Sequence, residues 1–428
     1  MSRKDMLKLA KELNGFIDSS VTAAHCAYEA EKKLLKNGFK RLYETDEWKL
    51  KKGDKFYVFR HESALIAGVC GKKEPKVSGF RIVGSHTDSP AFKLKPKAAF
   101  VREGYIQLST EVYGGPIFPS WLDRELSLAG KVVVKKGKSY DIMLVDLEKP
   151  VLVIPQLAIH YNREVNEAFK LNPQENMVPV MALTDKPVSD EYIRDIIAAK
   201  LKIKAADIVN YDLELYAYQK GEIIGFNEEF VMNRGLDNKT MVHASLQALL
   251  EAKPSDSTMI IALYDNEEVG SSTTNGGKSS FTEHVLERLT GFKREDYVRA
   301  ISLSYYISAD GAHAIHPNYA GKFDSLNKVY LNKGPVIKIN ANTSYATTIE
   351  SSAVFEMICR DKKIPYQKFV NRADMRGGGT IGSMISSNLG IRTVDVGNTM
   401  LAMHSARETA GVEDHYWMKE AMKGFLEY

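Results

Sequence analysis

The sequence predicts an α/β protein in which a central mixed sheet is flanked by helices and carries an inserted β-rich domain. Helical and strand-like segments alternate at both ends of the chain, as they do when helices cover a sheet. Between these ends strand-like alternation dominates, and glycine and proline turns separate the strands. Apolar strands on both sides of this stretch end in carboxylate or imidazole residues. We therefore assign residues 1–92 and 233–428 to one domain and residues 93–232 to an insertion.

The first domain is expected to open with helices and continue into strands. Ser19 or Ser20 is placed to cap a helix over residues 21–36, and Asn37 and Gly38 supply its C-terminal stop. Strands are then expected over residues 55–60, 63–68 and 81–85.

Short strands make up most of the insertion. We expect them over residues 105–112, 126–134, 140–147, 151–154, 213–218 and 226–231, with one helix over residues 189–202. Helix and strand alternation returns at residue 235. The expected elements there include a helix over 241–252 and strands over 258–264, 301–307 and 392–396.

Four of the apolar strands lead into residues of metal-ligand type. They are His86 and Asp88 after 81–85, Glu267 and Glu268 after 258–264, Asp310 after 301–307, and His404 after 392–396. Asp237 stands before the helix 241–252, where capping of the helix is the ordinary role of an aspartate. Because ligands bind beyond the carboxyl ends of strands in open α/β sheets, we expect these residues to share one site.

The adjacent glutamates at the end of strand 258–264 carry the strongest signal. Two carboxylates at the mouth of a buried strand are costly unless a cation receives them. One can ligate a metal while the other moves a proton. The alternative is a solvated acidic loop that precedes a helix, since carboxylates often gather there.

We interpret the set as a site for two metal ions. The expected ligands are His86, Asp237, Glu268, Asp310 and His404, with Asp237 bridging, Glu267 as general base and Asp88 orienting the imidazole of His86. Mixed imidazole and oxygen ligands suit zinc and tolerate manganese or cobalt. His313 and His316 compete with Asp310 for its role, because imidazole is an equally good zinc ligand.

Two further segments are each compatible with more than one role. His160 belongs to the insertion, and it is compatible with a third metal ligand, a hydrogen-bond donor to the transition state or a packed structural residue. The glycine-rich run 377–382 lacks the lysine of a phosphate loop and does not match a dinucleotide-binding fingerprint. Gly378, Gly379 and Thr380 are expected to approach a substrate, with a plain tight turn as the alternative.

The bulk composition excludes several classes of function. Fifty-eight basic and 54 acidic residues leave a net charge of +4, too mild to indicate nucleic-acid binding. Three scattered cysteines indicate a reducing compartment, and neither a signal peptide nor a membrane span is evident. We expect a cytoplasmic protein.

Five motifs together resemble the aspartyl aminopeptidase family of dinuclear zinc exopeptidases. They are His-Thr-Asp-Ser-Pro at 86–90, Leu-Asp-Asn at 236–238, Tyr-Asp-Asn-Glu-Glu-Val-Gly at 264–270, Ser-Ala-Asp-Gly-Ala-His-Ala-Ile-His-Pro-Asn-Tyr at 308–319, and Met-His-Ser-Ala-Arg-Glu at 403–408. The resemblance covers essentially the whole chain and implies a zinc exopeptidase fold that removes N-terminal residues from peptides in the cytosol.

The same resemblance implies an assembly and a role for His160. Members of the family form homo-oligomers, tetrahedral dodecamers, through the β-rich insertion. The histidine that matches His160 reaches the active site of a neighbouring subunit and helps to polarise the scissile carbonyl. Acid-selective members carry basic residues where this chain has the polar, neutral stretch 340–345, so acidic and neutral first residues both stay open.

Two other functions are compatible with these residues. One is a related two-metal amidohydrolase or carboxypeptidase. The other is a non-catalytic, self-assembling shell of the same fold, which could lose its ligands without penalty.

Overall fold

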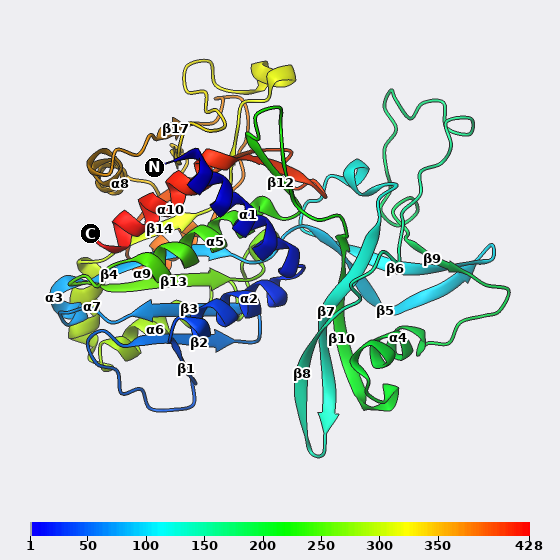
Figure 1. Ribbon diagram of the computed structural model, residues 1–428, viewed down its shortest axis with the longest axis horizontal. Helices are drawn as coiled ribbons and strands as arrows, with labels where there is room; N and C mark the ends of the chain where they lie inside the picture. Colours follow the sequence, from blue (N-terminus) through cyan, green and yellow to red (C-terminus); the bar gives the residue numbers. More distant parts are fainter. Residues whose placement is uncertain (1) are drawn as a thin grey trace. The chain divides into compact units, whose positions relative to one another are not determined.

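In this computed structural model, which describes residues 2–428, the chain divides into two compact units. Of the described residues, the first comprises 2–88, 221–403 and 408–428, and the second comprises 89–220 and 404–407. The corresponding boundaries predicted from the sequence are residues 93 and 232. Figure 1 shows the order of the elements along the chain.

A nine-stranded mixed sheet forms the centre of the first unit. Its strands in spatial order are β1 (Lys40–Leu42), β2 (Lys55–Arg60), β3 (Ala64–Val69), β13 (Thr258–Tyr264), β4 (Phe80–His86), β14 (Tyr305–Ala309), β18 (Arg392–Gly397), β16 (Val336–Lys338) and β17 (Gln367–Phe369). β4 pairs in parallel with both β13 and β14, and β14 pairs in parallel with β18. The carboxyl ends of these four strands therefore meet at one edge of the sheet.

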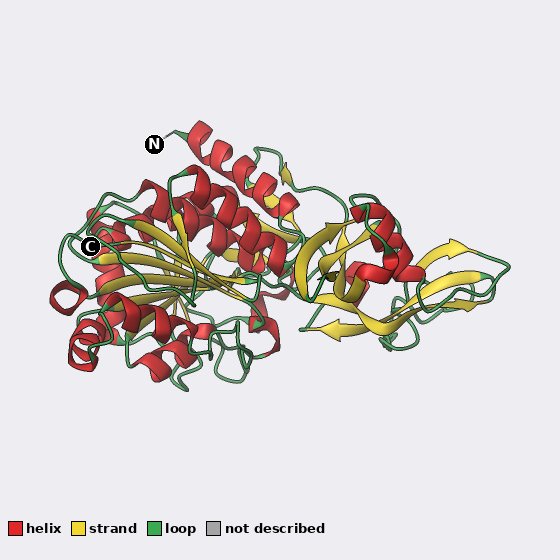
Figure 2. Cartoon of the chain, turned by 90° about the horizontal axis from the view of Figure 1, so that it is seen from below, coloured by secondary structure: helices red, strands yellow, loops and turns green. Residues whose placement is uncertain are grey.

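Helices cover both faces of this sheet, as Figure 2 shows. They are α1 (Arg3–Ser19), α2 (Ala23–Lys36), α3 (Pro75–Ser78), α5 (Leu236–Glu251), α6 (Phe281–Leu289), α7 (Arg294–Ser302), α8 (Ile349–Asp361), α9 (Ile381–Leu389) and α10 (Val412–Leu426). Successive residues of the apolar strand β13 face opposite sides of the sheet and belong to two separate cores. Met259, Ile261 and Leu263 pack with α1, α2, α5, α8 and α10. Ile260, Ala262 and Tyr264 pack with α6, α7 and α9.

A smaller five-stranded sheet also belongs to the first unit. Its strands are β11 (Glu222–Ile224), β12 (Phe230–Asn233), β20 (Glu408–Gly411), β19 (Thr399–Leu401) and β15 (Ala312–His313).

The second unit is built on a six-stranded antiparallel sheet. Its strands in spatial order are β8 (Ser139–Asp146), β7 (Leu126–Lys136), β10 (Ile208–Ala217), β5 (Ala91–Arg102), β6 (Tyr105–Tyr113) and β9 (Val180–Leu183). The helix α4 (Tyr192–Leu201) packs with these strands around a separate core that includes Trp121 and Leu128. The predicted fold class, a mixed α/β protein with a β-rich insertion, is confirmed.

Several sequence predictions of single elements are wrong. Thr22, not Ser19 or Ser20, caps α2, and its side chain accepts from the His25 backbone N–H. Residues 151–154 form only isolated bridges. Residues 226–229 form the turn between β11 and β12, where a strand over 226–231 is predicted. Residues 301–302 end the helix α7, so the strand predicted over 301–307 begins at Tyr305. Alternation of apolar residues identified the strand cores, but it did not locate these ends.

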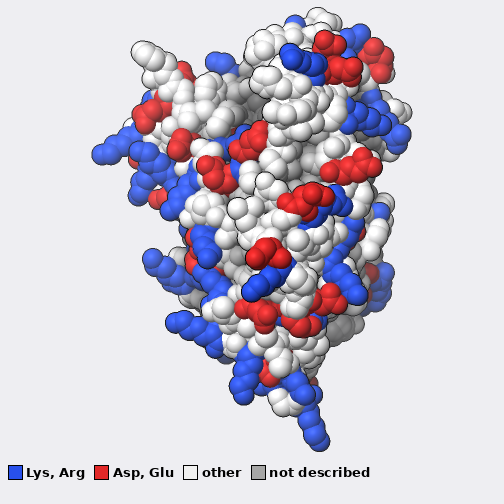
Figure 3. Space-filling view, turned by 90° about the vertical axis from the view of Figure 1, so that its right-hand side faces the viewer, with Lys and Arg blue, Asp and Glu red and all other residues white. Residues whose placement is uncertain are grey.

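Two surface properties bear on function. On the face seen in Figure 3, basic and acidic side chains are interspersed, in keeping with the net charge of +4. Among residues 2–428, every helix is either too short or too polar to traverse a lipid bilayer.

Candidate metal centre

The pairing of β4 with β13 brings His86 beside the two glutamates. Tyr264, the last residue of β13, is in register with His86, and its carbonyl accepts from the Thr87 N–H at 2.8 Å. The chain then turns through Asn266, whose φ is 61°, into a short 3₁₀ turn over Glu267–Val269. Two sequence-distant strand ends therefore present their polar residues to the same space.

Asp88 ties these two strand ends together. One carboxylate oxygen lies 3.3 Å from His86 Nδ1, and the Asp88 backbone carbonyl lies 3.1 Å from the same nitrogen. The carboxylate also accepts from the backbone N–H groups of Glu267 and Glu268, at 3.2 and 3.1 Å. Asp88 is therefore in contact both with the imidazole and with the turn that carries the glutamates.

Asp237 enters the site because the start of α5 is not helical. Asp237 and Asn238 depart from helical φ/ψ, so the first turn does not have the geometry of a simple capped helix. The Asp237 backbone N–H donates to Glu408 Oε2 at 3.0 Å, and the Asn238 side chain donates to the Ala309 carbonyl at 2.8 Å. These contacts hold the Asp237 carboxylate toward His86 and replace the N-cap role that the sequence left open.

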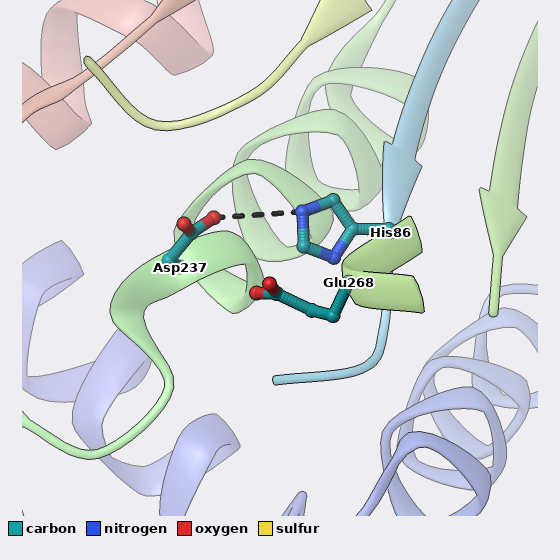
Figure 4. Close-up of side chains that lie close together, drawn as sticks. All are labelled: His86, Asp237 and Glu268. Atoms are coloured by element: carbon teal, nitrogen blue, oxygen red, sulfur yellow. Dashed lines mark ion pairs between the residues drawn. The ribbon is translucent and has the colours of Figure 1, made fainter. Parts of the chain in front are cut away.

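His86, Asp237 and Glu268 converge on one point. Each offers a ligand atom, and these atoms all lie within 4.8 Å of one another. Figure 4 shows the three side chains pointing toward a common space, with the ion pair between His86 Nε2 and Asp237 Oδ1 at 3.5 Å. Glu267 Oε2 lies 4.0 Å from the same His86 nitrogen. We call His86, Asp237, Glu267 and Glu268 the acidic cluster.

Crowding of buried carboxylates shifts the titration of the acidic cluster. Burial, and then the charge of Asp237, raises the pKa of Glu268 to about 10. Burial also raises the pKa of Glu267 to about 8, with Asp310 and Asp237 adding to it and His86 opposing it. Burial alone would lower the pKa of His86, but Asp237 and Asp88 raise it well above its usual range. The cluster therefore favours added positive charge.

Asp310 interacts electrostatically with the acidic cluster and forms an ion pair with Lys338. Burial raises the pKa of Asp310, the ammonium of Lys338 lowers it, and Asp237 raises it further. The Lys338 Nζ lies 3.5 Å from Asp310 Oδ1, and both side chains are almost fully buried. β16 pairs with β18, and the side chain of Lys338, the last residue of β16, reaches Asp310 from there.

The residues present fit a zinc ion. One imidazole and two carboxylates are within mutual reach, which is a donor set that zinc accepts. The raised pKa values of Glu267 and Glu268 agree with this, because a divalent cation would offset both causes, burial first and then the charge of the neighbouring carboxylates.

Two of the expected residues belong to the second unit. His404 lies there with its Nδ1 3.1 Å from the Gly115 carbonyl oxygen, and His160 lies on an exposed loop. Their roles stay predictions.

The remaining expected residues lie in the first unit. His313 is exposed at the end of β15, and His316 Nδ1 accepts from the Asn318 N–H at 3.2 Å. Gly378 and Gly379 are exposed, whereas Thr380 is buried and caps α9. A role for the glycines toward a substrate stays a prediction.

Three buried charged residues near the site were missed in the sequence. They are Lys338, Asp395 and Glu408. Glu408 is the last residue of the motif at 403–408, so the sequence could have indicated it as a site residue. Lys338 and Asp395 lie inside strands, where an alternating pattern indicates only which face a residue occupies.

Comparison with known proteins gives a consistent picture. The family model described as aminopeptidase I zinc metalloprotease (M18) matches residues 16–426. The probable M18 family aminopeptidase 2 of Clostridium acetobutylicum is 45% identical, over 99% of this chain and 99% of the relative. The probable M18 family aminopeptidase 2 of Pseudomonas aeruginosa (strain UCBPP-PA14) is 41% identical, over 95% of each chain.

Solved structures agree with these matches. Ape4, from a cryo-EM structure of its complex with Nbr1, superposes with a TM-score of 0.96 at 33% identity, covering 99% of this chain and 86% of Ape4. The mApe1 dodecamer of S. cerevisiae gives a TM-score of 0.86 at 29% identity, covering 98% of this chain and 96% of that one. An M18 aminopeptidase from Thermotoga maritima gives 0.87 at 22% identity, covering 100% and 97%, and this likeness concerns the fold alone.

Proposed function

The chain belongs to the aminopeptidase I zinc metalloprotease (M18) family, and from that premise we propose that it releases the N-terminal residue of peptides by means of two zinc ions and Glu267 as general base. The observation that carries this proposal is the convergence of His86, Asp237 and Glu268, whose ligand atoms lie within 4.8 Å of one another.

We assign the ligands as the sequence does. His86, Asp237 and Glu268 would hold the metal, with Asp310 and His404 completing the two coordination sets and Asp237 shared between them. Bound zinc would supply a lowered pKa for water and a polarised scissile carbonyl, and manganese or cobalt would be substitutes. Asp88 would orient His86, which the 3.3 Å approach of its carboxylate supports.

Glu267 is suited to moving the proton. Its side chain is 15% exposed and its Oε2 lies 4.0 Å from His86 Nε2, so it is a member of the acidic cluster that solvent can reach. Bound zinc would lower the raised pKa of Glu267 from about 8, so that the ionised carboxylate could accept a proton near neutral pH. Glu267 would take a proton from the attacking water and deliver it to the departing amine nitrogen.

His160 would act across a subunit boundary. It is exposed on a loop of the β-rich unit, which supports a role outside its own chain. We propose that residues 93–232 form the oligomerisation domain and residues 1–92 and 233–428 the catalytic domain. We propose a cytoplasmic homo-oligomer, and by analogy with mApe1 this assembly would be a dodecamer. In it, His160 would donate a hydrogen bond to the scissile carbonyl oxygen in the neighbouring subunit. A third metal ligand is its alternative role.

One assay tests the proposed function. Purified protein would be stripped with a chelator, reloaded with zinc, manganese or cobalt, and given aminoacyl reporter substrates with acidic or neutral first residues. We expect zinc-dependent release of the reporter, and no release when the same substrates carry an acetylated N-terminus. The ratio of acidic to neutral turnover would decide the first-residue preference.

Each other outcome of this assay points to another function. Turnover of acetylated substrates or of C-terminal residues would identify an amidohydrolase or a carboxypeptidase. Loss of particle size on chelation, without turnover of any substrate, would identify a structural metal in an assembly shell.

A further inference from the structure

Asp395 is a carboxylate that the proposed reaction does not use, and it has no exposed surface. It lies on β18 in register with Ser308, two residues before Asp310 on β14. An ionisable side chain in such a place is costly unless its oxygens are well satisfied. The hydrogen-bond partners of Asp395 therefore indicate its role.

Each carboxylate oxygen of Asp395 holds a different loop. Thr380 Oγ1 donates to Oδ1 at 2.5 Å, and the Ala346 backbone N–H donates to Oδ2 at 2.6 Å. The Asp395 backbone N–H in turn donates to Thr347 Oγ1 at 3.0 Å. Residues 340–347 and 377–380, which we call the two rim loops, are thus fastened to one buried side chain.

The chain is built to let the second rim loop approach Asp395 closely. Thr380 also caps α9 by accepting from the Gly382 N–H at 3.2 Å. A Cβ atom at Gly382 would lie 2.4 Å from Asp395 Oδ2, so a larger residue there would displace the helix end or the carboxylate. Glycine at this place is explained by that approach.

The rim loops are also linked to each other and to Asp310. A Cβ atom on Gly379 would lie 3.9 Å from the Ser344 carbonyl oxygen, so the two loops are neighbours. Tyr345 is buried beneath its loop, and the Lys338 ammonium lies 5.5 Å from the centre of its ring. The same ammonium lies 3.5 Å from Asp310 Oδ1. Lys338 is therefore a cation shared between the candidate ligand Asp310 and the rim loops.

The anchored ends of the rim loops are buried and their tips are open. Tyr345 and Thr380 are almost completely buried, whereas Asn342, Thr343, Gly378 and Gly379 are exposed. Exposed glycines leave backbone N–H and C=O groups accessible to a peptide. A surface that binds a substrate requires loops whose ends are held in place and whose middle residues are accessible, and the rim loops meet both conditions.

We propose that Asp395 is a positioning residue that fixes the rim loops as a wall for the first residue of the peptide. This inference rests on the proposed function and adds to it a determinant of substrate recognition. Asp395 would act through Thr380 and Ala346, without touching the substrate.

Substitutions at Thr380 give the sharpest test. Thr380→Val keeps the shape of the side chain but removes the hydroxyl that Asp395 accepts from, whereas Thr380→Ser keeps the hydroxyl. Thr393→Val is the matched control, because Thr393 is a buried threonine on the same strand whose hydroxyl donates to the Ile391 carbonyl and not to either rim loop. Asp395→Asn is the direct variant, since its amide has one acceptor oxygen where the carboxylate has two, so the Ala346 N–H and the Thr380 hydroxyl can no longer both donate to it.

The kinetic readout separates positioning from simple loss of stability. For Thr380→Val we expect KM for aminoacyl substrates to rise about 10-fold while kcat changes less than about 3-fold, with a changed ranking of first residues. Bound zinc should be unchanged. Thr393→Val should keep the KM and the ranking of the parent protein, and Thr380→Ser should recover most of the affinity that Thr380→Val loses.

Hydrogen–deuterium exchange supplies a readout that does not depend on activity. In Thr380→Val and Asp395→Asn, the amides of residues 340–347 and 377–380 should exchange at least about 10-fold faster, because their shared anchor is weakened. Thr393→Val should leave them unchanged. If Asp395→Asn does not fold, the Thr380 pair decides the question alone.

Two results would overturn the inference. One is an active parent protein in which Thr380→Val keeps its KM and its ranking of first residues. The other is equal acceleration of exchange in the Thr393→Val control. If instead the parent protein releases no N-terminal residue at all, that result contradicts the proposed function itself. The role of Asp395 in peptide binding is then contradicted as well, because it rests on that function.

Discussion

Two groups of buried titratable side chains in the α/β unit respond to burial in opposite ways. The acidic cluster gathers groups of like charge, and it relieves their repulsion by holding protons. The other group is the histidine pair, His243 on α5 and His415 on α10, whose ring nitrogens lie 2.9 Å apart. Burial lowers the pKa of His415 to about 3 and that of His243 well below its usual range.

The difference teaches that burial alone does not mark a functional site. The neutral histidines stack on each other, and the ring of His243 lies tilted against Phe16, with ring centroids 5.3 Å apart. Gln247 Nε2 lies 3.3 Å from His243 Nε2, so the pair packs as part of the core. The acidic cluster cannot be neutral without bound protons or a cation. Like charges held together are the sign of a site that expects a ligand.

The largest expected effect comes from the proton-transfer member of the cluster. Glu267→Gln should lower kcat by about 10³-fold, because an amide cannot accept the proton of the attacking water. Zinc measured per subunit should stay at the parental value. Glu12→Gln, on the exposed face of α1, is the control and should be fully active. Near-parental turnover of Glu267→Gln would remove Glu267 from the role of general base.

The next effect separates metal binding from folding. Asp237→Asn should weaken zinc binding by at least about 100-fold, measured by competition with a chelating dye. Without metal, the same variant should still fold, because the backbone N–H of Asp237 keeps its bond to Glu408 and only the 3.5 Å ion pair with His86 is lost. A metal-free variant that does not fold would mean that Asp237 serves the fold rather than an ion.

The metal-free protein should lose stability as the pH rises. The folded-state pKa values of Glu267 and Glu268 are raised to about 8 and about 10, so the folded state binds more protons than the unfolded chain. Their contribution is fully present below about pH 4.5 and is lost as the pH rises toward 8 to 10. Each group contributes a slope of about 1.4 kcal/mol per pH unit within that window. Urea unfolding at pH 5, 6, 7 and 8 would measure it, and zinc should flatten the curve.

The histidine pair should give a slope of opposite sign over a lower range of pH. Its folded-state pKa values are lowered, so its contribution is present above about pH 6.5 and is lost as the pH falls below that value. His415→Gln should remove about 1.4 kcal/mol per pH unit of acid sensitivity between pH 6.5 and 5. His284→Gln, at an exposed position, is the control. An unchanged acid sensitivity in His415→Gln would show that the pair is already accessible to protons in the folded state.

The sequence predicted the family, the fold class and the strands that lead to the site. The family model and the curated relatives confirm the resemblance carried by the five motifs. The bounds of β2 and β13 were predicted without error, since each is a continuous apolar strand with polar residues at its ends. The ligand atoms of His86, Asp237 and Glu268 lie within 4.8 Å of one another, and their role as metal ligands stays a prediction.

What the sequence did not reveal depends on tertiary pairing. The ion pair of Lys338 with Asp310 could not be predicted, because it depends on the pairing of β16 with β18. Asp395 is one carboxylate within an apolar strand, and its partners Ala346 and Thr380 lie 49 and 15 residues away. The turn of Asp237 out of the helix depends on Glu408, which is 171 residues distant. No local pattern encodes such contacts.

The place of β4 in the central sheet has a consequence for how the protein is made. Its neighbours β13 and β14 begin at Thr258 and Tyr305, so the ribosome releases β4 long before either partner exists. At typical rates of translation the wait for β14 is about 10 to 40 s, during which an apolar strand has both edges open. Nascent chains that stop within the insertion should therefore aggregate or recruit chaperones, whereas chains long enough to include β14 should not.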